Sequence, residues 1–254
     1  MKQIASSFVH AFSMYSKIPM PRASWKKEDM KYAMCFFPLI GAVIGAIMYG
    51  AFFLFDWIEC GEIMKAAILS VIPIIITGGI HLDGWLDTMD ARNSYKEKEA
   101  KLEILKDPHI GAFAVIKCMV YAIVLVGFMS EISERSIVII SIGFILSRAF
   151  SGLGVVYFKG AKKDGLLATF SSSAEKKVVR FVLILYVIAC GIVMPFINPV
   201  MGIACFIMSV IVFIYYKYMS YKEFGGITGD LAGYFLQLCE LMILITAVVV
   251  DYLL

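Results

Sequence analysis

Apolar stretches of about twenty residues recur along this chain, and they constrain its fold more than any other feature. A helix of about 20 apolar residues is long enough to cross the hydrocarbon core of a bilayer. We expect spans at 33–56, 64–80, 110–129, 136–158, 179–198, 200–218 and 232–253. The second of these contains Pro73 and the pair Gly78 and Gly79, so we expect a kink in it. The sequence therefore predicts an all-α fold, a polytopic transmembrane helical bundle with about seven spans.

Composition supports one membrane domain. Hydrophobic residues make up 61% of the chain and charged residues only 17%, whereas soluble domains are about a quarter charged. No polar linker of domain-dividing length interrupts the spans, so we expect a single integral membrane domain over residues 1–254. Its first part, 1–32, is predicted to be an amphipathic segment, with a helix on the membrane surface that is ended by Pro19 and Pro21. The rest, 33–254, forms the transmembrane bundle and its cytoplasmic loops.

Lysine and arginine are distributed unevenly between the two sets of loops. If the N-terminus is cytoplasmic, the segments 1–32, 81–109, 159–178 and 219–231 lie on that side and hold most of the Lys and Arg. The opposite turns are largely acidic or neutral. This asymmetry follows the positive-inside rule. We therefore expect a cytoplasmic N-terminus in the plasma membrane, with the unusual polar motifs on the cytoplasmic face.

Three aspartates follow the second span in the segment GGIHLDGWLDTMDARNS. Asp83, Asp87 and Asp90 are spaced i, i+4 and i+7, and on a helix these positions share one face. Clustered carboxylates repel one another, and a hard divalent cation such as Mg²⁺ relieves that repulsion. His81 precedes them and could transfer a proton or orient a carboxylate. The pattern favours a magnesium site over a solvated loop of ordinary acids.

A second motif, LKDPHIGAFAV, precedes the third span. It contains Lys106, Asp107, His109 and Gly111. A Lys-Asp pair and a glycine at a helix start suit a phosphate site, because free amides and the helix dipole favour an anion. An ordinary capping turn has the same residues, so both interpretations stay open.

A third motif, EFGGITGDLAGYFLQLCEL, leads into the last span. Glycines surround Thr228 and Asp230, and such a loop could face a phosphate or a nucleotide. The alternative is a turn in which Asp230 caps the helix. Arg148 lies about halfway along the fourth span and needs an anion there. Its partner is either Glu240 of the last span or a substrate phosphate.

The three motifs together closely resemble the cobalamin synthase family, the adenosylcobinamide-GDP ribazoletransferases. The resemblance rests on GGIHLDGWLDTMDA, KDPHIGAFAV and GGITGDLAGYFLQLCEL, with SMYSKIPMP and FFPLIGAVIG near the N-terminus. It covers essentially the whole chain, with the motifs in the expected order. Ala91 and Ala114 stand where the family commonly has glycine. Neither difference removes a charged group.

The resemblance implies the last joining step of the cobamide lower loop. A hydroxyl of α-ribazole, or of its 5′-phosphate, attacks the cobinamide-side phosphorus of adenosylcobinamide-GDP. GMP leaves, and adenosylcobalamin or its 5′-phosphate forms. The family requires Mg²⁺ and works at the cytoplasmic membrane. The expected partners are these two substrates and the lipid bilayer, without nucleic acid; a homo-oligomer is compatible with the sequence.

Displacing a nucleoside monophosphate builds negative charge that metal ions and cationic side chains stabilise. The predicted metal ligands are Asp83, Asp87, Asp90 and Asp107, the last for a second metal site. The predicted catalytic residues are Asp83, Asp87, Asp90 and His81, with Asp90 as metal ligand or general base. The predicted substrate-binding residues are Lys106, His109, Gly111, Arg148, Thr228 and Asp230, with Lys106 and Arg148 contacting phosphate.

Two alternatives stay open. The acid set also resembles that of the CDP-alcohol phosphotransferases, membrane enzymes that displace CMP with clustered aspartates and divalent metal. Their pattern begins D-x-x-D-G, but the position three residues before Asp83 is Ile80, and the later D-x-x-x-D pair is absent at its spacing. The alternative from another class is a transporter that uses the charges Lys117, Arg148 and Glu240 within the spans.

The predicted orientation can be tested with single cysteines on a background that lacks the native ones. Lys96→Cys and Lys163→Cys should react with a membrane-impermeant thiol reagent only after the cells are opened, because both positions lie in predicted cytoplasmic loops. Glu59→Cys, in a predicted outer turn, should react in intact cells and serves as the control. Labelling of position 96 or 163 from outside would show that the orientation is wrong.

Overall fold

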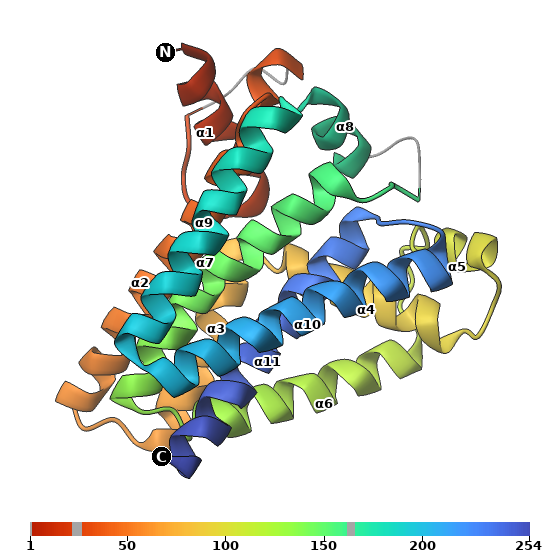
Figure 1. The fold of residues 1–254 in the computed structure, drawn as a ribbon. Coiled ribbons are helices and arrows are strands. Elements are labelled where there is room, and N and C mark those ends of the chain that lie inside the picture. The colour runs from red at the N-terminus through yellow and green to blue at the C-terminus, as the bar shows by residue number, and fades with distance from the viewer. Residues whose placement is uncertain (1, 22–26, 162–165) are drawn as a thin grey trace.

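The protein folds almost entirely into helices (Figure 1). The computed structural model describes residues 2–21, 27–161 and 166–254. Its helices are α1 (Lys2–Tyr15), η1 (Lys27–Met30, a 3₁₀ helix), α2 (Ala33–Trp57), α3 (Glu62–Thr77), α4 (Ile80–Asn93), α5 (Lys98–Ile104), α6 (Ala112–Met129), α7 (Glu134–Tyr157), α8 (Leu166–Ser173), α9 (Lys176–Ile197), α10 (Pro199–Phe224) and α11 (Gly229–Leu253). Within these ranges no β-strand forms beyond a single isolated bridge. The all-α prediction is confirmed.

Among the residues that the structure describes, six helices are long and apolar enough to cross a membrane. They are α2, α6, α7, α9, α10 and α11, and α3 with α4 adds a seventh if that bent pair counts as one span. Their positions match the predicted spans to within a few residues, except that α10 continues past the predicted end at 218 to Phe224. The extension places the acidic residue Glu223 on the helix instead of in a loop.

The chain bends by 95° between α3 and α4. Gly78 and Gly79 form this break with φ angles of 67° and 79°, a left-handed backbone that glycine adopts at little cost. Pro73 stays inside α3 and does not interrupt it. The predicted kink is therefore at the glycine pair, and the polar helix α4 turns sharply away from the direction of α3.

The helices pack around α7, whose apolar stretch is the most deeply buried of the six at 78%. It contacts α2 on one side and α9 and α11 on others, and Figure 1 shows α2, α7 and α9 running side by side. The turns that join α2 to α3, α6 to α7 and α9 to α10 lie at the lower left with the C-terminus. Helices α6 and α9 are peripheral and expose large apolar side chains such as Ile123 and Phe196, as lipid-facing helices do.

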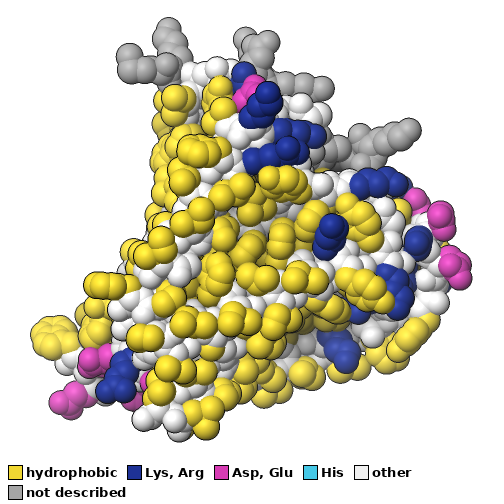
Figure 2. Space-filling model, viewed as in Figure 1, with side chains coloured by type: hydrophobic (Ala, Val, Ile, Leu, Met, Phe, Trp, Pro, Cys, Tyr) yellow, Lys and Arg dark blue, Asp and Glu magenta, His cyan; other side chains and the backbone are white. Residues whose placement is uncertain are grey.

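Charge separates toward the ends of the bundle. Figure 2 shows apolar side chains across the middle, Lys and Arg mainly at the top and right together with some Asp and Glu, and an acidic cluster with a basic side chain at the lower left. At the end of α2, Asp56 pairs with Lys65, which also lies 3.6 Å from Glu62. This distribution is the one on which the predicted orientation rests, and the orientation itself stays a prediction.

The N-terminal segment begins with a helix, as predicted, but one side of this helix packs against the bundle. His10, Ala11 and Phe12 of α1 are buried against the bundle, and α1 contacts α2 along its length. The prediction that this helix runs to the prolines is wrong, because it ends at Tyr15, where the Ser16 hydroxyl donates to the Phe12 carbonyl at 2.6 Å. Two further helices, α5 and α8, lie within segments predicted as loops.

Candidate active site

The three aspartates all lie on α4, as their helical spacing predicts. Asp83 is exposed, and Asp87 and Asp90 are half-buried. The other face of the helix is buried and includes Gly84 and Trp85. One face of α4 therefore fixes the helix to the bundle while the acids line the opposite edge.

A fourth carboxylate joins the acids from α11. A Cβ added at Gly84 would lie 2.7 Å from the carbonyl oxygen of Asp230, so the two backbones touch there. Burial raises the pKa of Asp87 to about 6, and the nearby carboxyls of Asp83, Asp230 and Asp90 act in the same direction. Carboxylates from two helices thus destabilise the charged form of Asp87, and a cation would reverse that cost.

The donor set suits a hard divalent ion in its chemistry. Mg²⁺ prefers carboxylate oxygens together with substrate phosphates and water, and it does not need an all-protein cage. In the part of the chain that the structure describes, no three His, Cys, Asp or Glu side chains converge closely enough to hold an ion by themselves. The residues of this site would supply part of a coordination shell, with Asp83 and Asp87 as ligands, Asp90 as a further ligand or the general base, and substrate oxygens as the remainder.

A cavity of about 270 Å³ opens beside these acids. Helices α1, α2, α4, α7, α8 and α11 all contribute to its wall, which includes Asp83 and Asp230. His81 also lines it, only 4% exposed, and its Nε2 has no hydrogen-bond partner among the described residues. Burial and then the charge of Arg148 lower the pKa of His81 to about 3, so its ring is neutral at ordinary pH.

The third motif forms the start of α11 against this cavity. Thr228 is the N-cap, and its hydroxyl accepts a hydrogen bond from the backbone N–H of Leu231 at 3.2 Å. The interpretation of Asp230 as the cap is therefore wrong: Asp230 lies in the first turn and faces the cavity. Gly229 lines the same wall. A helix N-terminus at this position favours an anionic ligand.

The second motif is divided in two by the structure. Asp107 accepts hydrogen bonds from the backbone N–H of His109 at 3.0 Å and from its Nδ1 at 2.7 Å, and Lys106 pairs with Glu103 at 2.7 Å. These side chains are exposed and do not line the cavity. Gly111, by contrast, is the N-cap of α6 without a side-chain cap bond.

Gly111 is brought directly to the acids. A Cβ added there would lie 2.0 Å from Oδ1 of Asp90, so the carboxyl lies directly against Gly111 and would have to shift for any larger residue. Neither Asp107 nor another side chain of the motif caps α6, so the capping interpretation fails. The glycine instead leaves the space that the Asp90 carboxyl occupies.

Arg148 finds its anion inside the protein. Its Nη1 donates to Oε1 of Glu240 at 2.7 Å, and the Ser147 hydroxyl donates to the same oxygen at 2.9 Å. The guanidinium is 1% exposed and does not line the cavity beside the acids. Of the two partners left open by the sequence, the structure selects Glu240, and the assignment of Arg148 to a substrate phosphate is corrected.

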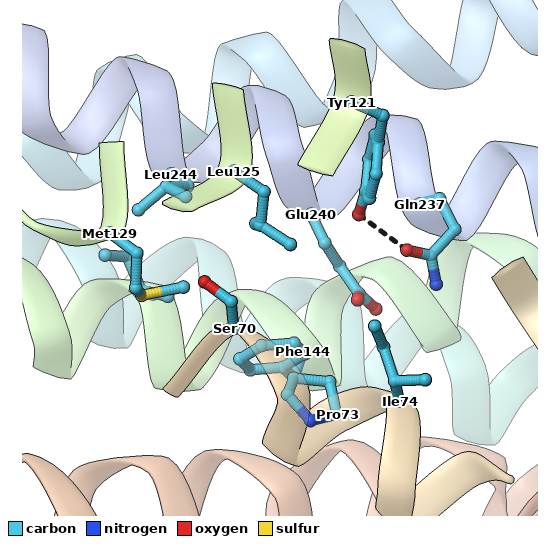
Figure 3. A pocket seen from close by; sticks show the side chains of 11 residues that line it. Ser70, Pro73, Ile74, Tyr121, Leu125, Met129, Phe144, Gln237, Glu240 and Leu244 are labelled. Atoms are coloured by element: carbon cyan, nitrogen blue, oxygen red, sulfur yellow. Dashed lines mark hydrogen bonds between the residues drawn. The ribbon is translucent and has the colours of Figure 1, made fainter. Parts of the chain in front are cut away.

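Glu240 also borders a second, much smaller cavity, shown in Figure 3. Its volume is about 30 Å³, enough for a water molecule. Beside it the Tyr121 hydroxyl donates to Oε1 of Gln237 at 2.6 Å. Two polar pairs, Tyr121 with Gln237 and Arg148 with Glu240, therefore lie within the bundle near this cavity. The cavity is distinct from the one beside the acids.

Sequence reasoning missed the residues that hold α4 in place. Glu223 accepts two hydrogen bonds from Arg92, at 3.0 and 3.2 Å, and pairs with Lys101 at 3.1 Å. Arg92 also donates to the Tyr234 hydroxyl at 3.1 Å. These contacts tie α4 and α5 to α10 and α11. The sequence signal for Glu223 is a single acid that follows the sixth predicted span in a cytoplasmic segment, and it does not show which basic side chains the acid meets.

The fold and the site define a polytopic α-helical membrane protein with its carboxylates gathered beside a cavity at one end of the bundle. Comparison with known sequences is consistent with this class and narrows it. The sequence model of the family described as cobalamin-5-phosphate synthase matches residues 7–248. The chain belongs to that family.

Relatives with an assigned activity support the same membership. An adenosylcobinamide-GDP ribazoletransferase of Lachnoclostridium phytofermentans is 48% identical over 251 residues, covering 99% of this chain and 96% of the relative. One of Clostridium perfringens strain 13 is 34% identical over 230 residues, covering 90% and 91%. No solved structure matches the chain. The family supports the transferase over the CDP-alcohol phosphotransferase and transporter alternatives.

The Arg148 and Glu240 pair can be tested by unfolding in mixed detergent and SDS. Arg148→Ala should lower the free energy of unfolding by about 3–5 kcal/mol, because it leaves a buried carboxylate without its cation. The double change Arg148→Ala with Glu240→Ala should recover much of that loss. Arg135→Ala, at an exposed position of the same helix, is the control and should change it by less than about 0.5 kcal/mol. A double variant no more stable than Arg148→Ala would contradict the pairing.

Proposed function

We propose that the protein joins adenosylcobinamide-GDP to α-ribazole, or to α-ribazole 5′-phosphate, with release of GMP. Family membership and the printed activity of its relatives support this reaction. The observation that carries it to particular residues is the contact of α4 with α11 at Gly84, which gathers Asp83, Asp87 and Asp230 beside a cavity. The product is adenosylcobalamin or its 5′-phosphate.

The reaction exchanges one phosphorus–oxygen bond for another. The ribazole hydroxyl oxygen bonds to the cobinamide-side phosphorus, and the bond from that phosphorus to the bridging oxygen breaks, so GMP leaves with the bridging oxygen. The hydroxyl proton passes to a carboxylate. Asp90 is our choice for this base, because its carboxyl lies directly against Gly111 at the N-terminus of α6. Asp83 and Asp87 would hold a divalent cation, which would supply positive charge for the diphosphate.

Mg²⁺, when bound, neutralises the charge that builds on the phosphate oxygens. The chain supplies the ligands and keeps them in register. Glu223 fixes the C-terminal end of α4 through Arg92, and the glycine pair fixes its N-terminal end. His81, neutral and buried, lies in the cavity wall two residues before the first acid. We place the active face at the cytoplasmic side of the plasma membrane, because most Lys and Arg lie in the loops on the same side as the acids.

The metal assignment predicts loss of turnover with retention of fold. Asp83→Ala or Asp87→Ala should lower GMP release by about a thousandfold or more, because the metal contributes several kcal/mol to transition-state stabilisation. Glu97→Ala changes an exposed acid in the segment after α4 and is the control. GMP release by purified protein is measured at increasing Mg²⁺, with the melting temperature alongside. Near-normal turnover of either aspartate variant at ordinary Mg²⁺ would refute the assignment.

The place of Asp90 predicts a separate effect of Gly111→Ala. The backbone there, at φ −79° and ψ 152°, suits alanine, so the helix should form normally. The new methyl group would occupy the position of the Asp90 carboxyl, and GMP release should fall at least about tenfold. Gly127→Ala, on the same helix with nothing near the added methyl, is the matched control. Equal turnover in the two variants would show that Asp90 is not held in this way.

A further inference from the structure

Aromatic rings form part of the wall of the cavity beside the acids. Tyr15 from α1, Phe37 from α2 and Phe170 from α8 all line it, with His81 from α4. The ring centroid of Tyr15 lies 4.6 Å from that of Phe37 and 5.8 Å from that of Phe170. Three helices that are distant in sequence thus bring their rings together at one place. We call this part of the cavity the aromatic wall.

The other residues that line the cavity give it an apolar body and an acidic edge. Apolar side chains from α1, α2, α7, α8 and α11 complete the body, and Asp83 and Asp230 mark the edge. The volume of about 270 Å³ accommodates one bicyclic ring system and is too small for a corrin macrocycle. The cavity therefore suits a molecule with a flat aromatic body and a polar end that reaches the carboxylates.

The polar groups available to such a body are few. His81 Nε2 is buried and lacks a partner among the described residues, and it lies in the cavity wall. Ser151 of α7 also lines the cavity. A purine carries several donors and acceptors on its edge, and burying them unpaired would cost free energy. A benzimidazole carries a single free ring nitrogen, which one donor satisfies.

We infer that this cavity binds the benzimidazole base of α-ribazole, with the rings of Tyr15 and Phe170 as the residues that select it. The inference rests on the proposed function and names the substrate that enters this cavity. The base lies against the aromatic wall, where stacking and burial of apolar surface stabilise it. The ring nitrogen accepts from His81. The ribose then extends toward Asp83, which brings its hydroxyl to the reacting end of the site.

The positions of Tyr15 and Phe170 explain why we expect them to affect the binding of α-ribazole and not the chemical step. Tyr15 is the last residue of α1, and Phe170 lies on α8; neither helix is one of the spanning helices. Both therefore cover the cavity from outside the bundle without carrying the metal ligands. Changing their rings alters the fit of the base and leaves the acids where they are. A KM effect for one substrate is the expected signature.

Steady-state GMP release with each substrate varied in turn tests the inference. Tyr15→Leu and Phe170→Leu remove a ring and keep an apolar side chain. Each should raise the KM for α-ribazole about tenfold, because base stacking on a ring is lost, and should leave kcat and the KM for adenosylcobinamide-GDP within about twofold. Phe12→Leu and Phe150→Leu change buried rings that do not line the cavity and should leave both KM values unchanged.

A base-selectivity arm uses the α-riboside of adenine as a competing substrate. Wild-type protein should prefer α-ribazole, and the two leucine variants should lose at least about fivefold of that preference. A rise in the KM for adenosylcobinamide-GDP instead would mean that guanine occupies the cavity, and it would overturn the inference. Unchanged KM values in both variants would overturn it too. Failure of the proposed function is distinguishable, because wild-type protein would then release no ribazole-dependent GMP; melting temperatures check that each variant folds.

Discussion

The approach of two backbones at Gly84 is the contact on which the rest of the site depends. A side chain at that position would meet the carbonyl of Asp230, so only glycine lets α4 lie directly on the first turn of α11. That contact adds a carboxylate from a second helix to the three on α4. It also closes one wall of the cavity, since residues of both helices line it. The acids and the cavity are therefore consequences of one helix crossing, and neither could be kept if the helices moved apart.

Contacts at both ends and along one face hold the polar helix α4 beside the apolar bundle. α4 is too polar to be stabilised by lipid, so it is fixed at its ends and along one face. The left-handed glycines set its direction at one end, and Arg92 with Glu223 anchors the other. Between them Trp85 stacks on Tyr234 of α11 with ring centroids 4.9 Å apart. The exposed edge is left free to carry like charges whose repulsion a cation must balance.

Features that depend on local sequence could be predicted, and features that depend on contact between distant helices could not. The spans follow from apolar length, which is a local property, and the helical spacing of Asp83, Asp87 and Asp90 is likewise local. The partner of Arg148 required knowing which face of α11 meets α7. The role of Glu223 depends on the continuation of α10 beyond its apolar stretch. The sequence does not distinguish an acid at the end of a helix from an acid in the loop that follows it. Tyr15 and Phe170 gave no signal, since rings in amphipathic segments usually only pack.

The docking of α1 has a consequence for how this protein is divided into parts. Judged by hydropathy alone, the N-terminal helix lies outside a membrane bundle that begins at Ala33. Its contacts show instead that it forms a wall of the cavity, because Met14 and Tyr15 line the same cavity as Asp83. A chain shortened to start at α2 would keep every apolar span and the aspartates of α4 and α11. Its cavity, however, would lose the wall that α1 forms and would be open to water on that side. The boundary of the catalytic unit therefore lies before the first span, in a segment whose sequence alone resembles a surface anchor.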